Sequence, residues 1–219
     1  MKTIIVFSGG LDSTTLLYHM RSLNADVAAL TVNYNQRHSK EIEYAKNLCA
    51  SLNVQHRVID IPGLQGVLGV NALTSSQADV PEGEYRDDTI KVTTVPNRNM
   101  ILLSVAIAWA SALKFDSVAF GAHSGEHTNY PDCKPPFAKA MDAVARVCDW
   151  DPIEVLCPFV DWNKGDIVKR GIELNVPFEK TWSCYNGRQF HCGKCSTCMD
   201  RLQAFRQAGI QDPAEYESA

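Results

Sequence analysis

The stretch that most constrains this chain is residues 8–13, where Ser-Gly-Gly-Leu-Asp-Ser stands between an apolar run and a helical pattern. The β-branched run at 4–7 predicts a strand, and Leu16, Met20 and Leu23 recur with helical spacing. Two glycines let the intervening turn adopt positive φ and bring its backbone N–H groups close to a ligand. With the positive end of a helix behind them, these groups form a concave anion site. The sequence therefore predicts a bound phosphate or pyrophosphate at this turn.

The side chains of the loop support the same prediction. Ser8, Ser13 and Thr14 supply hydroxyl donors, and Asp12 can orient the loop or help to hold a metal ion. A Gly-Gly pair after a strand is often only a turn, and the chain has neither a Walker A motif nor a Rossmann glycine fingerprint. The complete string resembles the PP-loop of the ATP-pyrophosphatase superfamily, whose members use ATP to turn a poor leaving oxygen into a good one. This resemblance implies that ATP binds at Phe7, Ser8, Gly9, Gly10, Leu11, Asp12, Ser13, Thr14, Thr15, Leu16 and Leu17.

Strands and helices alternate along the chain. Further strands are predicted at 26–32, 56–61, 116–121 and 153–159. Helices are predicted at 39–52 with Ser39 as cap, at 100–113, at 137–147, from a cap at Asp161 or Asn163 to Leu174, and at 199–208. This alternation implies parallel pairing and right-handed crossovers, so we expect an α/β fold with a doubly wound, mostly parallel sheet. The helix at 100–113 is apolar all round and should be packed within the fold.

Two segments at the predicted sheet edge leave their roles open. Ligands of such sheets bind beyond the carboxyl ends of the strands, where the 8–13 loop lies. Residues 34–38, Tyr-Asn-Gln-Arg-His, follow the second strand at that edge and are either a polar crossover loop or part of the nucleotide pocket. Residues 62–96 carry glycines, prolines and acidic groups without clear periodicity, and we interpret them as a mobile flap or an insertion.

Four of the eight cysteines crowd into one short segment with metal-site spacing: Cys184, Cys192, Cys195 and Cys198. Four soft sulfur ligands suit a tetrahedral, structural zinc ion that would pin the last helix to the main body. A cysteine-bound iron–sulfur cluster is the competing interpretation, because consecutive Cys-x-x-Cys steps also occur in ferredoxin-type sites. His191 could replace a thiolate, although four sulfurs already complete a tetrahedron.

Composition limits the partners and the compartment. A net charge of −4 and an isoelectric point near 5.8 give no electrostatic footprint for a nucleic-acid backbone, so no nucleic-acid partner is expected. The longest uncharged run, 99–113, is too short to span a bilayer comfortably, and no secretory signal is visible. The scattered cysteines are most simply reduced, which predicts a cytoplasmic protein without a membrane partner.

Several further strings occur in a fixed order: Tyr-Asn-Gln-Arg-His at 34–38, Pro-x-Arg-Asn-Met at 96–100, Tyr-Pro-Asp-Cys at 130–133, and Cys-Tyr-Asn-Gly at 184–187 before the cysteine knuckle. Together with the PP-loop they resemble the 7-cyano-7-deazaguanine synthase family, the queuosine-pathway branch of the superfamily. The resemblance runs from residue 1 to about 205, while 62–94 matches little. It implies an ATP-dependent carbon–nitrogen ligase that converts 7-carboxy-7-deazaguanine and ammonia into the nitrile.

The resemblance also implies residue roles. Ser8, Asp12, Ser13 and Arg98 would be catalytic: the loop would hold the ATP phosphates, Mg²⁺ would bridge their oxygens, and Arg98 would neutralise phosphate charge or form only a surface ion pair. Lys164 could reach a phosphate, but a solvated lysine is the expectation. The candidates to recognise the polar edge of the deazapurine, each otherwise an ordinary loop hydrogen-bonding residue, are Asn97, Asn99, His123, Tyr130 and Asp132.

The expected organisation is one PP-loop ATPase domain over 1–219, with a nucleotide-binding core at 1–125 and a substrate- and zinc-binding helical lobe at 126–219. A homodimer is possible. Two other functions remain open: a PP-loop tRNA thiolase with an iron–sulfur cluster, and a non-catalytic zinc adaptor with a degenerate nucleotide loop. The first predicts brown protein and tRNA affinity, and the second predicts no ATP consumption with any carboxylate.

Overall fold

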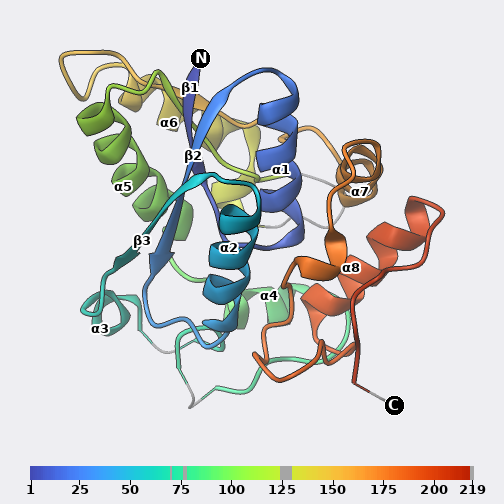
Figure 1. Ribbon diagram of the computed structural model, residues 1–219. Coiled ribbons are helices and arrows are strands. Elements are labelled where there is room, and N and C mark those ends of the chain that lie inside the picture. The colour runs from blue at the N-terminus through green and yellow to red at the C-terminus, as the bar shows by residue number, and fades with distance from the viewer. Residues whose placement is uncertain (70, 76–77, 124–129, 218–219) are drawn as a thin grey trace.

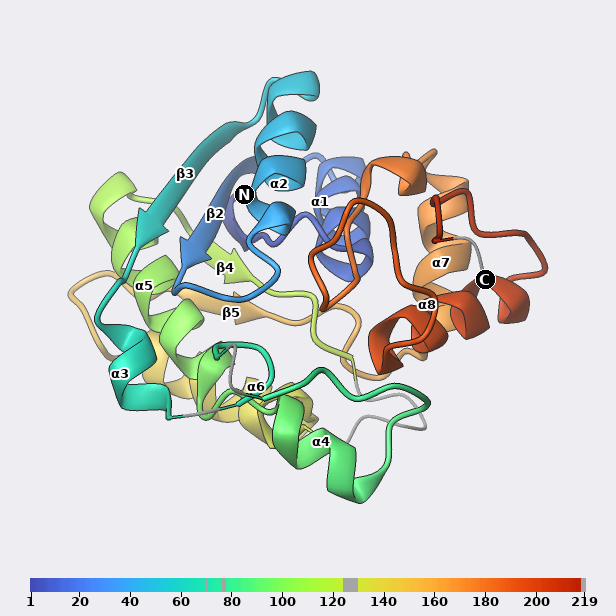
Figure 2. The same ribbon diagram turned by 90° about the horizontal axis from the view of Figure 1, so that it is seen from below.

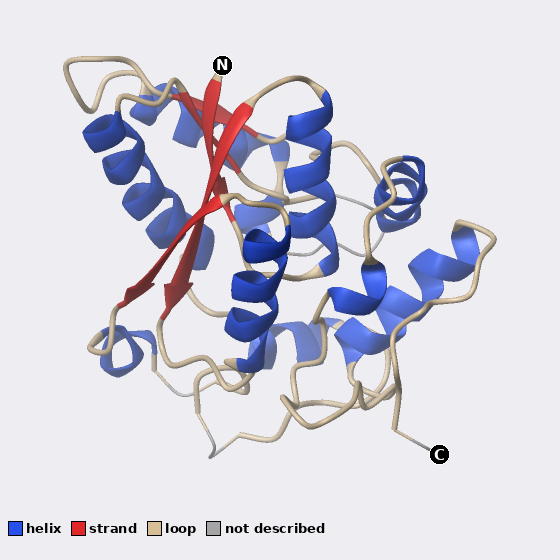
Figure 3. Ribbon diagram, in the orientation of Figure 1, coloured by secondary structure: helices blue, strands red, loops and turns tan. Residues whose placement is uncertain are grey.

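The computed structural model describes residues 1–69, 71–75, 78–123 and 130–217. Its sheet has five parallel strands in the order β3-β2-β1-β4-β5 (Figure 3). The strands are β1 (Lys2–Val6), β2 (Asp26–Asn33), β3 (Gln55–Asp60), β4 (Ser117–Ala119) and β5 (Glu154–Leu156). The α-helices are α1 (Leu11–Ser22), α2 (Lys40–Ser51), α3 (Leu64–Leu68), α4 (Asp87–Thr93), α5 (Arg98–Leu113), α6 (Pro135–Ala145), α7 (Lys164–Glu173) and α8 (Ser196–Gln207).

The winding direction of the chain changes at β1. Ile4 of β1 stands opposite Ala28 of β2 on one side and opposite Val118 of β4 on the other. The chain moves outward through β2 and β3, and then returns to the other side of β1 for β4 and β5. Such a reversal opens a crevice at the carboxyl ends of the two central strands. The predicted α/β fold with a doubly wound, parallel sheet is confirmed.

Neighbouring residues of the central strands belong to two separate cores. Ile4 and Val118 pack with α5 and α6, whereas Ile5 and Ala119 pack with α1, α2, α7 and α8. Side chains of a strand alternate between faces, so a sheet covered on both sides needs apolar residues at successive positions. Figure 1 shows α5 and α6 on one face, α1 and α2 on the other, and α7 and α8 beyond α1.

Helix α5 is less enclosed than its apolar sequence predicted. It buries Leu103, Ala106 and Ala110 against the sheet, but Met100 and Leu113 on its other side are 42% and 37% exposed. The helix therefore covers one face of the sheet and is not enclosed all round.

Two helix starts were predicted through caps. Asn163 caps α7 through a capping box: its Oδ1 accepts a hydrogen bond from the Asp166 N–H at 2.9 Å, and the Asp166 carboxylate accepts one from the Asn163 N–H at 3.4 Å. Asp161 is therefore not the cap. Ser39 precedes α2 as predicted, but its backbone is already helical and, within the described part of the chain, its side chain accepts no capping bond.

The segment at 62–96 contains two short helices, α3 and α4, which the absence of periodicity did not predict. It is tied to the body by backbone hydrogen bonds: Arg37 N–H donates to the Leu73 carbonyl at 2.7 Å, and Gly83 N–H donates to the Lys194 carbonyl at 2.8 Å. Figure 2 shows this segment passing from α3 through α4 beside the start of α8.

The predicted boundary between the two lobes, at 125/126, lies outside the described residues, and the division stays a prediction. Strand β5 and helices α6 and α7 of the second half pack on the same sheet as the first half. No helix within the described ranges combines the length and the apolar character that crossing a membrane would need.

Candidate functional site

A cavity of about 340 Å³ opens at the carboxyl edge of the sheet, between the ends of β1, β2 and β4. This volume is within the range of small-molecule sites. Its walls come from the loop after β1, the segment after β2, the start of α5, the residues after β4, the start of α7, the chain at 182–185, and α8. The cavity thus lies where the reversed winding of the sheet predicts a ligand.

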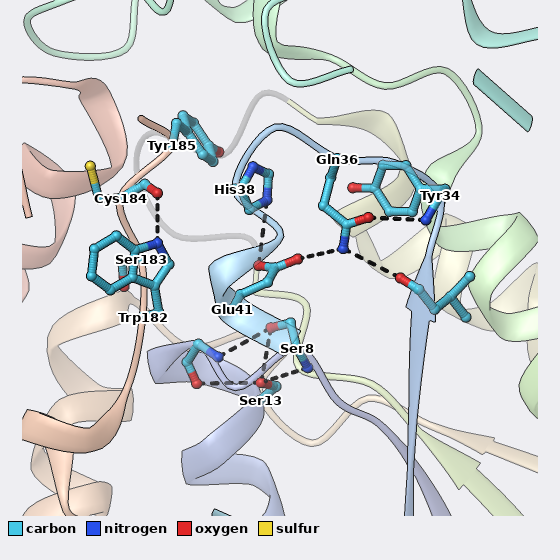
Figure 4. Close-up of polar contacts among 12 residues, drawn as sticks. Ser8, Ser13, Tyr34, Gln36, His38, Glu41, Trp182, Ser183, Cys184 and Tyr185 are labelled. Carbon is cyan, nitrogen blue, oxygen red and sulfur yellow. Dashed lines mark hydrogen bonds and ion pairs between the residues drawn. The ribbon is translucent and has the colours of Figure 1, made fainter. Parts of the chain in front are cut away.

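The floor of the cavity is the 8–13 loop, held in shape by its own hydroxyls (Figure 4). Ser8 Oγ and Ser13 Oγ lie 3.1 Å apart, and the Ser8 N–H donates to Ser13 Oγ at 3.2 Å. The Gly10 N–H donates to Ser8 Oγ at 3.3 Å, and α1 begins immediately afterwards at Leu11. The loop therefore offers backbone N–H groups, two hydroxyls and a helix N-terminus to an anion.

The eleven predicted nucleotide-binding residues divide into two groups. Six of them line the cavity: Phe7, Ser8, Gly10, Leu11, Asp12 and Ser13. The others lie behind it: Gly9, Thr14, Thr15, Leu16 and Leu17. Leu16 and Leu17 belong to the core, and the Thr15 hydroxyl donates to the Leu11 carbonyl within α1 at 3.0 Å. Their assignment to the nucleotide site stays a prediction.

Gly9 is required by packing. Its φ is +75°, and a Cβ added there would lie 2.6 Å from the backbone nitrogen of Ala45 and 2.9 Å from the Glu41 carbonyl oxygen in α2. Gly121, after β4, is similarly close to the loop, since its Cβ would lie 3.3 Å from the carbonyl oxygen of Asp12. The loop is thus clamped between α2 and the end of β4.

Charged groups meet beside the loop. Lys164 Nζ lies 2.6 Å from an Asp200 carboxylate oxygen and 3.6 Å from one of Asp12. Burial by itself would lower the pKa of Lys164, but the two carboxylates raise it above its usual range, so the amine stays protonated. The expectation of a solvated lysine was wrong: 14% of its side chain is exposed, and it lines the cavity.

Two polar atoms near this cluster are buried without a hydrogen-bond partner among the described residues, Asp12 Oδ1 and His123 Nδ1. Burial lowers the pKa of His123, so its ring is neutral near pH 7. A buried carboxylate oxygen without a donor is costly unless a ligand or a cation occupies the space beside it. Mg²⁺ prefers such oxygen ligands, so the carboxylates of Asp12 and Asp200 fit a phosphate-bound Mg²⁺.

The segment after β2 contributes to the cavity, which favours the pocket interpretation of 34–38 over a plain crossover loop. Tyr34 and His38 line it, together with Glu41 from the first turn of α2. Gln36 donates to one Glu41 carboxylate oxygen at 2.9 Å, and His38 Nε2 lies 3.4 Å from the other (Figure 4). This network fixes Glu41 next to the loop.

The cavity wall also holds three of the five predicted base-recognition residues: Asn99, His123 and Tyr130. The predicted catalytic residue Arg98 lines the cavity as well. Asp132 stands behind them: its carboxylate accepts the Asn99 backbone N–H at 3.0 Å, and its carbonyl accepts the Asn99 side-chain amide at 3.0 Å. Asp132 thereby positions the start of α5.

Asn97 and Cys133 complete this description of the wall. Asn97 is exposed, adopts a left-handed backbone before α5, and does not line the cavity. Cys133 does line it, but burial raises the pKa of its thiol to about 11, so it is a protonated wall residue and not a nucleophile.

The four clustered cysteines form a separate centre. The sulfurs of Cys184, Cys192, Cys195 and Cys198 all lie within 4.8 Å of one another and are buried. The separation of 3.9 Å between the Cys192 and Cys198 sulfurs is close to the roughly 3.8 Å edge of a tetrahedron with zinc–sulfur bonds of about 2.3 Å. Backbone N–H groups of Cys195 and Lys194 donate to the Cys192 sulfur at 3.3 and 3.4 Å. Thiolates with N–H donors in this arrangement fit a structural zinc ion.

Comparison with known proteins decides which family this site belongs to. The family model described as "Queuosine biosynthesis protein QueC" matches residues 2–209. The chain belongs to the QueC family. A 7-cyano-7-deazaguanine synthase from Marinomonas sp. (strain MWYL1) is 46% identical over 217 residues, which cover 99% of each chain. A 7-cyano-7-deazaguanine synthase from Methanoregula boonei is 44% identical over 217 residues, covering 99% of this chain and 100% of the relative.

The fold agrees with this membership. The structure of NMN synthetase from Francisella tularensis superposes with a TM-score of 0.51 at 15% identity, covering 95% of this chain and 77% of that one. At this identity the likeness shows the fold alone, the PP-loop α/β fold that the sequence predicted for this QueC-family chain.

Several cavity residues of this QueC-family chain were missed from the sequence. They are Glu41, Tyr85, Tyr185 and Asp200. Position relative to recognised features could have suggested two of them: Tyr185 follows a cysteine ligand, and Asp200 lies in the first turns of the helix after the knuckle. Tyr85 gave no signal, because the segment around it has no pattern.

Proposed function

We propose that this chain is an ATP-dependent ligase that converts 7-carboxy-7-deazaguanine and ammonia into 7-cyano-7-deazaguanine, in the cytoplasm. The observation that carries the proposal is a sequence identity of 44–46% to proteins named 7-cyano-7-deazaguanine synthase, along essentially the whole chain. The cavity supports it, because the phosphate loop lines it together with Arg98 and several aromatic residues. In this proposal the substrate is a free small molecule, and no nucleic acid takes part.

The chemistry explains why ATP is needed. A carboxylate resists nucleophiles, because its charge and resonance disfavour attack and oxide is a very poor leaving group. Transfer of a nucleotidyl or phosphoryl group from ATP to a carboxylate oxygen gives an activated ester, which ammonia attacks to form the amide. The amide oxygen is then activated by a second ATP and leaves with its group, the nitrogen loses two protons, and a C≡N bond remains. Water is formally removed overall.

The residues of this chain contribute positioning and charge. The N–H groups of the 8–13 loop and the hydroxyls of Ser8 and Ser13 would hold the phosphates, and protonated Lys164 would stabilise the charge that develops on them. Glu41, fixed by Gln36 and His38, stands beside the loop where a carboxylate can accept a proton from the attacking ammonia. Asp12 would orient the loop through its place in the first turn of α1.

Two metals have separate places in this proposal. Asp12 and Asp200 would hold Mg²⁺, which would supply positive charge to offset that of the phosphates. The four cysteines would hold a structural zinc that ties α8 to the chain at 184–192. An iron–sulfur cluster at the same cysteines, as a thiolase would need, would make the protein brown and would contradict this assignment.

Isotope transfer tests the activation. With both carboxylate oxygens of the substrate labelled with ¹⁸O, the label should appear in AMP if a nucleotidyl group is transferred, or in inorganic phosphate if a phosphoryl group is transferred. Both oxygens should be recovered in that nucleotide or phosphate pool, since both leave the carbon. Label released into bulk water would contradict activation by ATP. Sedimentation of the same protein tests whether the chain forms the homodimer considered from its sequence.

A further inference from the structure

Three tyrosines from distant parts of the chain meet on one side of the cavity. Tyr85 Oη lies 3.0 Å from Tyr185 Oη, and the rings of Tyr85 and Tyr130 stand at 87° with centroids 6.1 Å apart. All three line the cavity. Together they offer flat apolar surface with hydroxyl groups at its edge, which suits a planar bicyclic base that carries polar substituents.

Arg98 lies beside one of these tyrosines, Tyr185, and forms no ion pair with a carboxylate of a described residue. Its electrostatic neighbours are Tyr34, Tyr185, Cys133 and Asp132, and no carboxylate oxygen of a described residue comes within ion-pair distance of its guanidinium. Asp132 instead accepts the Asn99 backbone N–H. A guanidinium withdrawn from bulk water without an anion is costly, so this arrangement is explained if a bound ligand supplies the negative charge.

The two cationic side chains that line the cavity, Lys164 and Arg98, have different neighbours. Lys164 is held by Asp12 and Asp200 beside the phosphate loop. Arg98 has no loop residue among its neighbours and stands with the tyrosines. The proposed reaction likewise brings two anions, a polyphosphate and a carboxylate conjugated with a flat ring. A planar guanidinium matches a carboxylate with two parallel hydrogen bonds, while a lysine serves phosphate as a point charge.

We propose that Arg98 and Tyr85, Tyr130 and Tyr185 form the subsite for the carboxylated deazapurine, with the Arg98 guanidinium paired to the carboxylate that is to be activated. The inference rests on the proposed function and assigns Arg98 to the carboxylate in place of the ATP phosphates. Tyr85 brings the 80–86 stretch into this subsite.

The cysteine centre is what places Tyr85. Glu82 pairs with Cys195 in an antiparallel bridge, and Gly83 N–H donates to the Lys194 carbonyl at 2.8 Å. Tyr85 follows two residues later, and Tyr185 is adjacent to Cys184. Figure 2 shows the 80–86 stretch reaching the start of α8, where the knuckle lies. Both tyrosines are thus fixed from the same rigid centre.

Direct binding tests the subsite without turnover. Isothermal titration of the metal-loaded full chain, without ATP, compares 7-carboxy-7-deazaguanine with 7-deazaguanine, which lacks the carboxylate. Arg98→Gln should weaken binding of the acid by about 10- to 100-fold and change binding of 7-deazaguanine and of ATP by no more than about twofold. Arg98→Lys should recover only part of the loss. Arg146→Gln, at an exposed arginine that follows α6 directly, is the matched control and should change nothing.

Tyr85 gives a second, independent test. Tyr85→Ala should weaken binding of both bases about equally, by about 5- to 50-fold, because the ring faces the base and not its carboxylate. Tyr85→Phe should keep most of the affinity. Each variant should unfold at a Tm near that of the wild type. This result would show that the subsite has changed and the fold has not.

The outcomes separate the two proposals. If wild-type protein forms no nitrile from the acid, ATP and ammonia, the proposed function fails. If wild-type protein forms the nitrile but Arg98→Gln keeps its preference for the acid, or loses ATP affinity instead, this inference alone is overturned. Binding of neither base by active wild-type protein also overturns it.

Discussion

The Ser13 hydroxyl connects residues of the phosphate loop with one another through hydrogen bonds. It lies 3.1 Å from Ser8 Oγ, accepts the Ser8 N–H at 3.2 Å and donates to the Gly10 carbonyl at 3.3 Å. The same hydroxyl faces the cavity. One side chain therefore both shapes the anion site and is available to a phosphate, and such prearranged donors contribute most where charge develops.

Ser13→Ala should lower kcat by about 100-fold with little change in folding, because one prearranged donor is removed from the phosphate site. Steady-state kinetics with saturating ATP and ammonium measures the effect. Ser22→Ala, at a hydroxyl that donates to the His19 carbonyl at the far end of α1, is the control. Unchanged turnover in Ser13→Ala would remove the basis for the phosphate role of the loop.

The contrast between Ser13 and Lys164 shows what sequence can predict at this scale. Ser13 belongs to a contiguous string whose local geometry follows from strand, turn and helix. Lys164 lies about 150 residues later and reaches the same loop only because α7 packs on α1 within the shared core. No local pattern carries that contact, so its ion pairs with Asp12 and Asp200 could not be predicted.

At the scale of secondary-structure elements, helix α2 packs closely against the 8–13 loop at Gly9. Gly9→Ala should lower the free energy of unfolding by about 2–4 kcal/mol, since its Cβ would meet backbone atoms of α2 and its φ is +75°. Urea unfolding measures it. Gly63→Ala, where a Cβ has no heavy atom within 4 Å and φ is −77°, is the control and should be nearly neutral. Equal stability of the two variants would contradict this packing.

Helix α8 is held by a buried ion pair. Arg201 is fully buried, and its Nε and Nη2 donate to the two Asp212 carboxylate oxygens at 2.7 and 3.0 Å, while other donors reach the Thr181 hydroxyl and the Phe178 carbonyl. Arg201→Met should destabilise the protein by about 3–5 kcal/mol, because Asp212 is left buried without its partner. Arg206→Met, at an exposed position of the same helix, is the control in the same urea titration.

The pair also predicts a dependence on pH. Burial by itself would raise the pKa of Asp212, but hydrogen bonds from Arg201 outweigh this and bring it below its usual value. A lowered folded-state pKa contributes stability that is complete above the unfolded value of about 3.9 and is lost as pH falls from there through the folded pKa. Asp212→Asn should therefore be less stable than wild type at pH 7, with the difference shrinking below about pH 4. A difference that stays constant to acid pH would be the contrary result.

For the whole molecule, the cysteine centre joins segments that the sheet alone would not hold together. It contacts α8, the chain at 184–192 and the 82–83 stretch. Elemental analysis should find one zinc per chain and no iron. Removal by a strong chelator should cost about 3 kcal/mol of stability, or roughly 6–12 °C in Tm for a chain of this size. Cys195→Ser should lose the zinc and Cys148→Ser, at an exposed thiol, should retain it; full stability without metal would contradict a structural role.

For the whole molecule, the parallel sheet could be predicted from the sequence, but the segment at 62–96 beside its carboxyl edge could not. Apolar strands alternating with amphipathic helices determine a parallel sheet, and the four-cysteine spacing determines a metal centre. The segment at 62–96 shows no periodicity, and its described part is tied to the rest of the chain by contacts such as the hydrogen bond from Gly83 to Lys194. Tyr85 enters the cavity through those contacts.

The most direct test of the account is the identity of the product. Wild-type protein incubated with ATP, ¹⁵N-ammonium and 7-carboxy-7-deazaguanine should yield, by mass spectrometry, a nitrile that carries the labelled nitrogen, with nucleotide consumed only when the acid is present. Unchanged acid together with intact ATP would contradict the central claim.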